Sequence, residues 1–476
     1  VDTIANLGAY SLVLAAVTPT YLYAPLLLGI YDIPTACCTV KGVYTNTAPT
    51  DAYRGAGRPE ATYVIERIVT EAAKEIGMDQ AEFRKKNFIK KFPHQQCLVH
   101  NIDSGDYDAH LDKAIELSDY KNFENRRSQS AKKGKLRGIG FSTYFEACGV
   151  APSAVVMSIG AGVGLWESAE IRFNPTGNVS VFTGTHSHGQ SHDTTFAQIV
   201  GDKLGVAIEN IDIVHGDTDK GPFGMGTYGS RSLAVGGTAI VNACDKIIAK
   251  GKKVAAKMLE GKPEDIDFKA GEFILKNSNK KKTIGEIAFA CYLPGTFGDI
   301  KSPLPEGVEP GLVETSFFDP SNFSFPSGTH ICEVEVDEET GETKLVKYTV
   351  VDDFGTVINP LVVEGQVYGG VAQGVGQALY ENAHYDESGQ LTSASYMDYT
   401  MPRADNFPQI ALDYTCTPAT SNPLGAKGCG EAGTIAAPAA VMNAVIDAIG
   451  TDVSMPATSE KIWKILKKNG SKKAAA

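Results

Sequence analysis

Several patterns that carry well-known chemistry are missing from this chain of 476 residues. Its nine cysteines form no CxxC pair and follow no zinc or iron–sulfur spacing, which indicates isolated thiols in a reducing compartment. The sequence has no GxxxxGK[ST] string and no GxSxG string. The sequence therefore contains no motif that would indicate P-loop nucleotide hydrolysis or serine-hydrolase catalysis.

Basic residues are also scarce, with 44 Lys and Arg against 56 Asp and Glu and a net charge of −12. An acidic chain without a long basic stretch is a poor candidate for binding nucleic acid or an anionic membrane. The Lys-rich stretch 461–473 is the exception, and we interpret it as a solvated final helix. No signal peptide is visible, so we expect a cytoplasmic protein, free or peripherally attached to the inner face of the membrane.

One uncharged run, residues 10–31, is long enough to span a bilayer. Pro19 and Pro25 interrupt it, and proline breaks a helix interior. We therefore expect a buried core segment here and no transmembrane span.

The sequence mixes helical and strand periodicity, which predicts a mixed α/β (α+β) fold with two large domains or about three smaller ones. Period-3.6 patterns and capping signals predict helices over 59–77, 79–90, 107–129, 196–204, 231–260, 361–381 and 432–449, and one beginning at Thr458. Alternating patterns predict strands over 138–146, 167–173, 178–183, 211–215, 331–337 and 343–352, the second and third forming a hairpin.

Glycine is abundant, with 49 residues, and it clusters, which suggests backbone brought close to a ligand. Two GxGxxG strings begin at Gly224 and Gly428, but neither follows a predicted strand as a dinucleotide-binding fold requires. Each opens a predicted helix, where freed backbone amides can bind phosphate. His186, His188 and His192 have spacings that allow metal binding, but a polar loop is the more common use of such residues.

Glu431 and Arg54 are the charged residues most suggestive of catalysis. Glu431 lies in the apolar segment GAKGCGEAGTIAAPAAV, where lost hydration would raise its pKa toward neutrality and suit it to general-base work. The alternative is routine capping of a helix start. Arg54 lies in AYRGAGRPE, where small neighbours leave room to face a ligand; the alternative is an ion pair with Glu60 or Glu66.

Five separated strings together resemble the large molybdenum subunit of the xanthine oxidase family of molybdenum hydroxylases. The resemblance is strongest to the aerobic carbon monoxide dehydrogenase and aldehyde oxidoreductase branches and covers nearly the whole chain. The strings are YTNTAPTDAYRGAGRPEA (44–61), GTHSHGQSHDTTFAQI (184–199), GDTDKGPFGMGTYGSRS (216–232), EGQVYGGVAQGVGQAL (364–379) and GAKGCGEAGT (425–434). The resemblance implies elongated molybdopterin-binding domains, with 1–130 as the C-terminal part of the first and 131–476 as the second.

The resemblance also implies roles for individual residues. Glu431 matches the general base, Arg54 the substrate-orienting arginine, and Gln190 and Gln373 glutamines that hydrogen-bond the pterin. Further cofactor contacts are expected at Gly55, Ala56, Gly189, Thr227, Ser230, Arg231, Ser232, Gly428 and Gly430. No side chain is expected to bind the metal directly.

The implied function is a molybdenum hydroxylase that oxidises an aldehyde or similar small carbon substrate with water as oxygen donor. The implied cofactor is molybdenum–molybdopterin, as the cytosine dinucleotide, with [2Fe–2S] clusters and FAD on partner subunits in a dimer of heterotrimers. A further N-terminal molybdenum-domain segment or chain is expected to complete the site.

Two alternatives stay open. Copper-containing carbon monoxide dehydrogenases resemble this chain but carry copper on a cysteine that follows the arginine, where this chain has Gly55. Carbon monoxide oxidation is therefore the second choice. A non-catalytic assembly subunit or truncated remnant is the alternative from another class.

Overall fold

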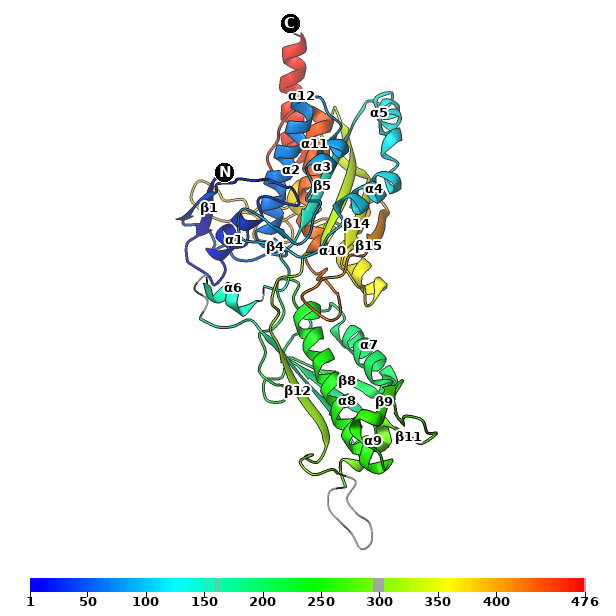
Figure 1. Cartoon of the computed structure of the whole chain (residues 1–476). Coiled ribbons are helices and arrows are strands. Elements are labelled where there is room, and N and C mark those ends of the chain that lie inside the picture. The colour runs from blue at the N-terminus through cyan, green and yellow to red at the C-terminus, as the bar shows by residue number, and fades with distance from the viewer. Residues whose placement is uncertain (151, 159, 161, 294–303, 475–476) are drawn as a thin grey trace.

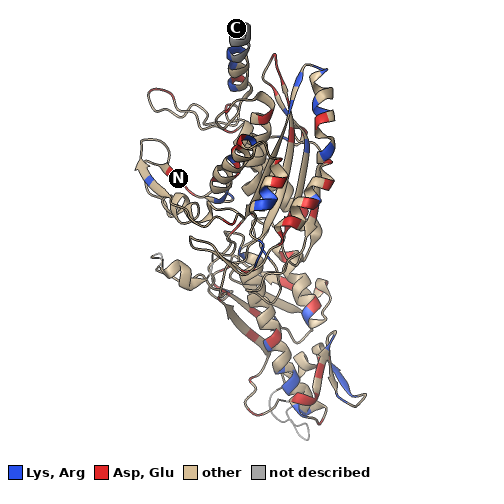
Figure 2. Cartoon of the chain, turned by 45° about the horizontal axis from the view of Figure 1, so that its top comes forward, with Lys and Arg blue, Asp and Glu red and all other residues tan. Residues whose placement is uncertain are grey.

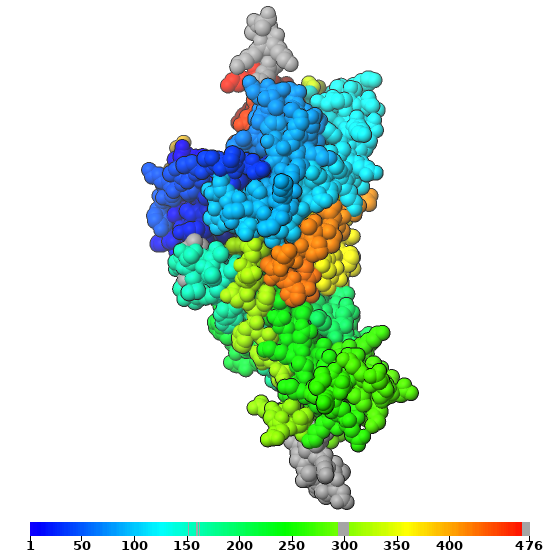
Figure 3. Space-filling view, viewed as in Figure 1, coloured from blue at the N-terminus to red at the C-terminus, as the bar shows by residue number. Residues whose placement is uncertain are grey.

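The computed structural model describes residues 1–150, 152–158, 160, 162–293 and 304–474. The molecule is elongated and has two lobes, each built on a four-stranded sheet with helices packed against it (Figure 1). In the space-filling view, the lobe coloured green projects from the larger body (Figure 3). This smaller lobe is inserted in the chain between β5 (Lys135–Phe145) and β13 (Ser327–Asp337), which pair with each other in the larger lobe.

The sheet of the larger lobe has the order β15-β14-β13-β5. β14 (Thr343–Asp353) runs antiparallel to β13, and the edge strand β15 (Ile410–Thr415) runs parallel to β14. Residues of the inner strands belong to two different hydrophobic clusters, one on each face of the sheet. Val334 and Val350 belong to one cluster, and Ile331 and Val351 belong to the other. Because both faces are apolar, each needs a cover of helices.

Helices α10 (Pro360–Leu379) and α11 (Ala432–Ile449) cover one face of this sheet. The helix α11 lies very close to β5. A Cβ atom on Gly140 would come within 2.1 Å of the Ala440 carbonyl oxygen. Glycine at this strand position thus allows α11 to approach the backbone of the sheet.

The opposite face is covered by α2 (Arg58–Glu75), α3 (Gln80–Asn87), α4 (Tyr107–Leu117) and α5 (Phe123–Ala131). Their apolar residues share one cluster with Phe141 and Ile331 of the sheet. The first 130 residues therefore do not have a core of their own, and a domain boundary near residue 130 stays a prediction.

The sheet of the smaller lobe has the order β12-β6-β7-β8. Its strands are β6 (Glu167–Phe173), β7 (Val179–Thr183), β8 (Ile211–Val214) and β12 (Leu312–Phe318). Helices α7 (His192–Leu204) and α8 (Thr238–Met258) pack with this sheet in a single hydrophobic cluster. A π-helical turn over Ser232–Gly237 leads into α8, and such turns are frequent at functional sites.

The remaining elements are short or peripheral. The strands are β1 (Asp2–Gly8), β2 (Thr39–Tyr44), β3 (His94–Gln95), β4 (Asn101–Ile102), β9 (Ile266–Lys269), β10 (Glu272–Leu275) and β11 (Lys281–Thr283). The helices are α1 (Val17–Thr20), α6 (Ser153–Ser158), α9 (Ile284–Ala290) and α12 (Ser459–Ala474), with 3-10 turns at Ala24–Leu26, Tyr120–Asn122, Ile208–Asn210, Pro263–Asp265 and Ala404–Asn406.

The predicted elements are largely present, with two corrections. The single helix expected over 107–129 is broken into α4 and α5, because the chain turns at Asp119 with φ of +50°. The helix expected from 231 begins as the π-helical turn and becomes α-helical only at Thr238. The hairpin of β6 and β7 is confirmed.

The uncharged run 10–31 contains only short helical turns, with Tyr10 and Val13 exposed and Ile30 and Tyr31 buried. The prediction of a buried core segment therefore holds for the second half of the run and is wrong for the first half, which lies mostly at the surface. Two other stretches, Ser232–Met258 and Ala432–Ile449, are apolar and long enough to cross a membrane, but 67% and 89% of an apolar 18-residue window in each are buried inside the protein. Both are therefore core helices of this fold.

Acidic and basic residues are interspersed along several helices in Figure 2, and basic residues gather on α12 near the C-terminus. The sequence of α12 contains six lysines: Lys461, Lys464, Lys467, Lys468, Lys472 and Lys473. Thr458 accepts a hydrogen bond from the Lys461 N–H at 3.4 Å, as expected for the residue that begins this helix.

Candidate active site

Glu431 lies where the loop 425–431 enters α11. Although it occupies the N-cap position, its carboxylate makes no capping hydrogen bond. Instead Oε1 accepts from the Gly55 N–H at 2.9 Å and Oε2 accepts from the Ser230 hydroxyl at 3.1 Å. The side chain is half-buried and joins three segments that are distant in sequence. Routine capping therefore does not explain this acid.

Arg54 lies beside the same loop and binds neither Glu60 nor Glu66. Its guanidinium donates to Gln373 Oε1 at 3.1 Å and to both the backbone and side-chain oxygens of Gln366 at 3.0 Å. It also donates to the Gly430 carbonyl. Arg54 thus ties α10 to the residue that precedes Glu431. Glu66 is paired with Arg84.

Sequence reasoning missed two charged residues of this cluster. Arg58, only 2% exposed, donates to the Ala147 carbonyl at 2.8 Å and lies near the backbone oxygens of Gly55 and Ala56. Glu146, which directly follows β5, is fully buried and contacts Glu431. Arg58 follows a glycine-rich turn, which was a usable signal; Glu146 follows an apolar strand and offered none.

The two carboxyl groups have opposite pKa shifts. Burial opposes ionisation of Glu431, but the Arg58 charge and the hydrogen bonds from Glu146, Gly55 and Ser230 outweigh it and hold its pKa below the ordinary value. Burial, followed by the nearby Glu431 charge, raises the pKa of Glu146 well above its ordinary range. The predicted upward shift at Glu431 is therefore wrong: loss of hydration does raise a carboxyl pKa here, but at its neighbour.

A second group of predicted residues lies on the smaller lobe. The Thr227 hydroxyl accepts from the His186 N–H at 2.9 Å and is 2.8 Å from the Ser232 hydroxyl. The Gln190 amide folds back on its own loop and donates to the His186 carbonyl at 3.4 Å. The loop 224–232 links this group to the first, because its Ser230 reaches Glu431. Contacts thus link several of the predicted residues at the junction of the lobes, and their shared role as one site stays a prediction.

Arg231 differs from its neighbours because it is 1% exposed and serves the fold. It forms an ion pair with Glu167 at 3.1 Å and donates to four backbone carbonyls, among them Gly226 at 2.9 Å. Its guanidinium therefore faces protein groups, and it shapes the loop that carries Thr227 and Ser230. A direct contact with the cofactor stays a prediction.

The backbone around the site is strained. Ala56, Val150, Ser191 and Ser230 all have positive φ angles, between +27° and +65°, although none is glycine. Such conformations cost energy and cluster where function demands them. Gly428 shows a related constraint, since a Cβ atom there would lie 2.2 Å from the Ser230 carbonyl oxygen.

The three loop histidines do not assemble a metal site. His186 stacks edge-on against His188 with ring centroids 4.6 Å apart, and His192 is buried at the start of α7. In the part of the chain that the structure describes, no group of three or more His, Cys, Asp or Glu side chains could hold a metal ion.

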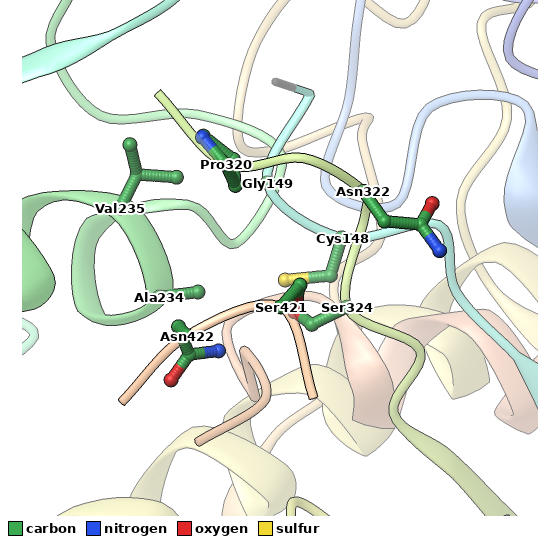
Figure 4. Close-up of a pocket in the computed structure, with 9 residues that line it drawn as sticks. All are labelled: Cys148, Gly149, Ala234, Val235, Pro320, Asn322, Ser324, Ser421 and Asn422. Carbon is green, nitrogen blue, oxygen red and sulfur yellow. The ribbon is translucent and has the colours of Figure 1, made fainter. Parts of the chain in front are cut away.

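A small cavity of about 10 Å³ lies behind Ser230. Four separate segments line it (Figure 4): Cys148 and Gly149, Ala234 and Val235, Pro320 to Ser324, and Ser421 with Asn422. The Cys148 thiol also donates to the Ser230 carbonyl at 2.9 Å. The cavity has room for about one water molecule, so a cofactor must bind elsewhere along the junction.

Comparison with known proteins decides the family. Residues 1–88 and 113–408 match two models that are each described as a molybdopterin cofactor-binding domain. The carbon monoxide dehydrogenase large chain of Hydrogenophaga pseudoflava is 41% identical over 98% of this chain and 58% of its own length. The chain belongs to the xanthine oxidase family of molybdenum hydroxylases.

Solved structures agree with this assignment. A crystal structure of Cu,Mo-CO dehydrogenase matches with a TM-score of 0.90 and 36% identity, over 98% of this chain and 59% of the other. Quinoline 2-oxidoreductase from Pseudomonas putida 86 matches with 0.91 and 32%, over 98% and 60%. The predicted family and mixed fold are confirmed. The chain spans somewhat more than half the length of these xanthine oxidase family relatives.

The residues present fit a pterin cofactor with an anionic tail. Helix α7 begins at the site without a side-chain cap, which leaves first-turn N–H groups for an anion. Gly189 and Gly226 have positive φ angles, and a Cβ atom on either would meet nothing within 4 Å. Glycine therefore keeps the backbone open beside Thr227 and Gln190.

Proposed function

We propose that this chain forms part of a molybdenum hydroxylase that oxidises an aldehyde or a heteroaromatic C–H group with water as the oxygen source. The observation that supports this most is the cluster in which Gly55, Ser230 and Arg54 hold the Glu431 carboxylate and its loop. When bound, molybdenum–molybdopterin, in its cytosine dinucleotide form, would supply the two-electron acceptor and the oxygen-transfer chemistry.

The residues of the chain supply the remaining work. Glu431 is held ionised and half-exposed, so it can take a proton from the water-derived nucleophile at either carboxylate oxygen. Arg54 fixes the loop of Glu431 against α10 and leaves one N–H of its guanidinium for substrate oxygen. Gly189, Gln190, Thr227 and Ser232 would hold the pterin and its phosphates.

The position after Arg54 argues against a copper centre. Gly55 has a φ of +98°, and a Cβ atom there would lie 2.6 Å from Pro59 Cγ. A cysteine at this position would need the turn to move. Burial also raises the pKa of the Cys429 thiol, near Arg54, to about 12, so it is not a thiolate at neutral pH. Carbon monoxide is therefore the second choice of substrate.

The proposed assembly is larger than this chain. Electrons must leave the site, and we place [2Fe–2S] clusters and FAD on partner subunits, in a dimer of heterotrimers. An additional N-terminal molybdenum-domain segment or chain would complete the wall opposite Arg54. The exposed apolar residues Tyr10, Val13, Tyr21, Tyr44 and Tyr53 support a covering partner on this side of the larger lobe.

The proposal is tested on the purified complex. Molybdenum, copper and cytosine nucleotide would be measured, and turnover followed with an artificial electron acceptor on aldehydes, N-heterocycles and carbon monoxide. The proposal predicts molybdenum and cytosine nucleotide near one per chain, little copper, and oxidation of an aldehyde or heterocycle. Stoichiometric copper with carbon monoxide oxidation would replace the substrate assignment, and absence of molybdenum would favour a non-catalytic subunit.

A further inference from the structure

Glu146 is a buried acid that the proposed chemistry does not yet use. Its side chain is fully buried, and it follows directly on β5, behind the loop that carries Ser230. Within the described residues, neither carboxyl oxygen of Glu146 accepts a hydrogen bond of good geometry, and the Ser230 hydroxyl, which also lies near Glu146, donates to Glu431. A buried carboxylate without a donor or a paired cation is costly, and burial favours its protonated form.

The neighbouring Glu431 has the donors that Glu146 lacks. The Gly55 N–H and the Ser230 hydroxyl both point at Glu431. The single hydroxyl proton of Ser230 is thereby used, and its oxygen accepts from the Glu431 N–H at 3.1 Å. Two carboxyl groups in contact can form a hydrogen bond only if one of them carries a proton. The donors place that proton on Glu146.

Several charged and titratable groups act on the carboxyl pair. The groups that face Glu146 are Glu431, Arg58, Arg54, Tyr144, Cys148 and Cys429. The Arg54 charge acts on both carboxyls, but its N–H groups donate to neutral acceptors on α10 and the loop. Arg58 is the cation that most favours ionisation of both carboxyls, so the hydrogen-bond donors at Glu431 decide which of the two carries the charge.

We propose that Glu146 keeps a proton at neutral pH and donates it in a hydrogen bond to Glu431, as a positioning residue that holds the general base ionised and aimed. The base role of Glu431 rests on the proposed function, whereas the pairing of the two carboxyl groups is independent of it. Because the two carboxyl groups interact, the titration of this proton reflects both groups together.

Infrared difference spectroscopy of the holoenzyme reads this proton directly. The parent minus Glu146→Gln spectrum at pH 7 should contain the C=O stretch of one protonated carboxyl group. The matched control Glu335→Gln removes an acid that is ion-paired with Arg137 and should leave that band unchanged. In Glu431→Gln the band should disappear at a lower pH than in the parent, because Glu146 has lost its negative neighbour.

Enzyme kinetics supply the second readout. Glu146→Gln keeps a donor toward Glu431 and should retain the parent's acid limb in the pH profile of kcat/KM. Glu146→Leu removes the donor, and its acid limb should move upward on the order of one pH unit. No carboxyl band in the parent difference spectrum, or a Glu146→Leu profile that overlays the parent, overturns the proposal.

Failure of the proposed function has a different signature. If Glu431→Gln stays active while the Glu146 band is present, the pair stands and the base role of Glu431 falls. If Glu431→Gln is inactive but the band is absent, the base role stands and the shared proton falls.

Discussion

Arg54 and Glu431 are separated by most of the chain, yet one short loop connects their functions. The Arg54 guanidinium donates to the Gly430 carbonyl. The residues that follow these two, Gly55 and Glu431, are joined by a hydrogen bond from the Gly55 N–H to Glu431 Oε1. Arg54 thus holds the Glu431 loop through the backbone, beside the role toward substrate that we propose for it. At this scale the sequence was informative, because glycines frame both residues.

Replacing Arg54 by Met should lower kcat/KM by about 10²–10³, a loss typical of one removed donor at a reacting centre. Arg54→Lys should not restore activity, because an ammonium group cannot reach Gln366, Gln373 and Gly430 together. Steady-state kinetics with molybdenum content as control measures this. Full activity in Arg54→Met would remove both roles.

Ser230 touches Glu431 twice, as donor to its carboxylate and as acceptor from its N–H. Ser230→Ala should therefore raise the pKa of Glu431 and move the acid limb of kcat/KM upward, since the ionised form loses a donor. Ser128→Ala, at an exposed position on α5, is the control. A shift equal in both variants would contradict this assignment.

Among the elements, the contact of α10 with α11 positions the site. Gly370 and Gly433 face each other, so that a Cβ atom on Gly433 would lie 2.4 Å from the Val367 carbonyl oxygen. Because the neighbour is backbone, it cannot move aside. This close approach sets the distance between the Arg54 partners on α10 and the start of α11.

Gly433→Ala should lower the free energy of unfolding by about 1–3 kcal/mol through overpacking. Gly365→Ala, on the partner helix α10 and with nothing within 4 Å of its added Cβ, should instead raise stability by up to about 1 kcal/mol through helix propensity. Denaturant titration of both variants compares them. Equal effects would mean that helix packing is not the constraint.

The sequence predicted the elements better than their junctions. Periodicity was sufficient for α2, α10 and α11, whose apolar faces are regular. It could not reveal the break at Asp119, which depends on a left-handed turn, or the pairing of Glu146 with Glu431. That pairing exists only because β5 ends beside a loop almost 300 residues away, and no local signal in an apolar strand announces it.

Over the whole molecule, two lobes meet at one site and bury several neutral imidazoles near it. Burial lowers the pKa of His110 to about 3 and of His100 and His192 to about 4. In the unfolded chain these groups titrate near pH 6.5, so the unfolded state binds more protons between these values. Their contribution to stability is complete above about pH 6.5 and is lost as the pH falls toward 4.

The free energy of unfolding should therefore fall by on the order of 1 kcal/mol per pH unit per buried imidazole between about pH 6.5 and 4. Denaturant titrations at a series of pH values measure this slope. His110→Gln should flatten it, whereas His384→Gln, at an exposed position, should not. A slope unchanged by His110→Gln would contradict neutral burial of that residue.

The account depends above all on Glu431 as the proton acceptor at a pterin-bound metal. The most direct test is turnover of Glu431→Gln in the purified complex, with molybdenum and cytosine nucleotide measured on the same sample and exposed Glu387→Gln as the control. The account predicts normal cofactor content and a loss of kcat of about 10²–10⁴. A fully loaded Glu431→Gln enzyme with near-parental turnover would contradict it.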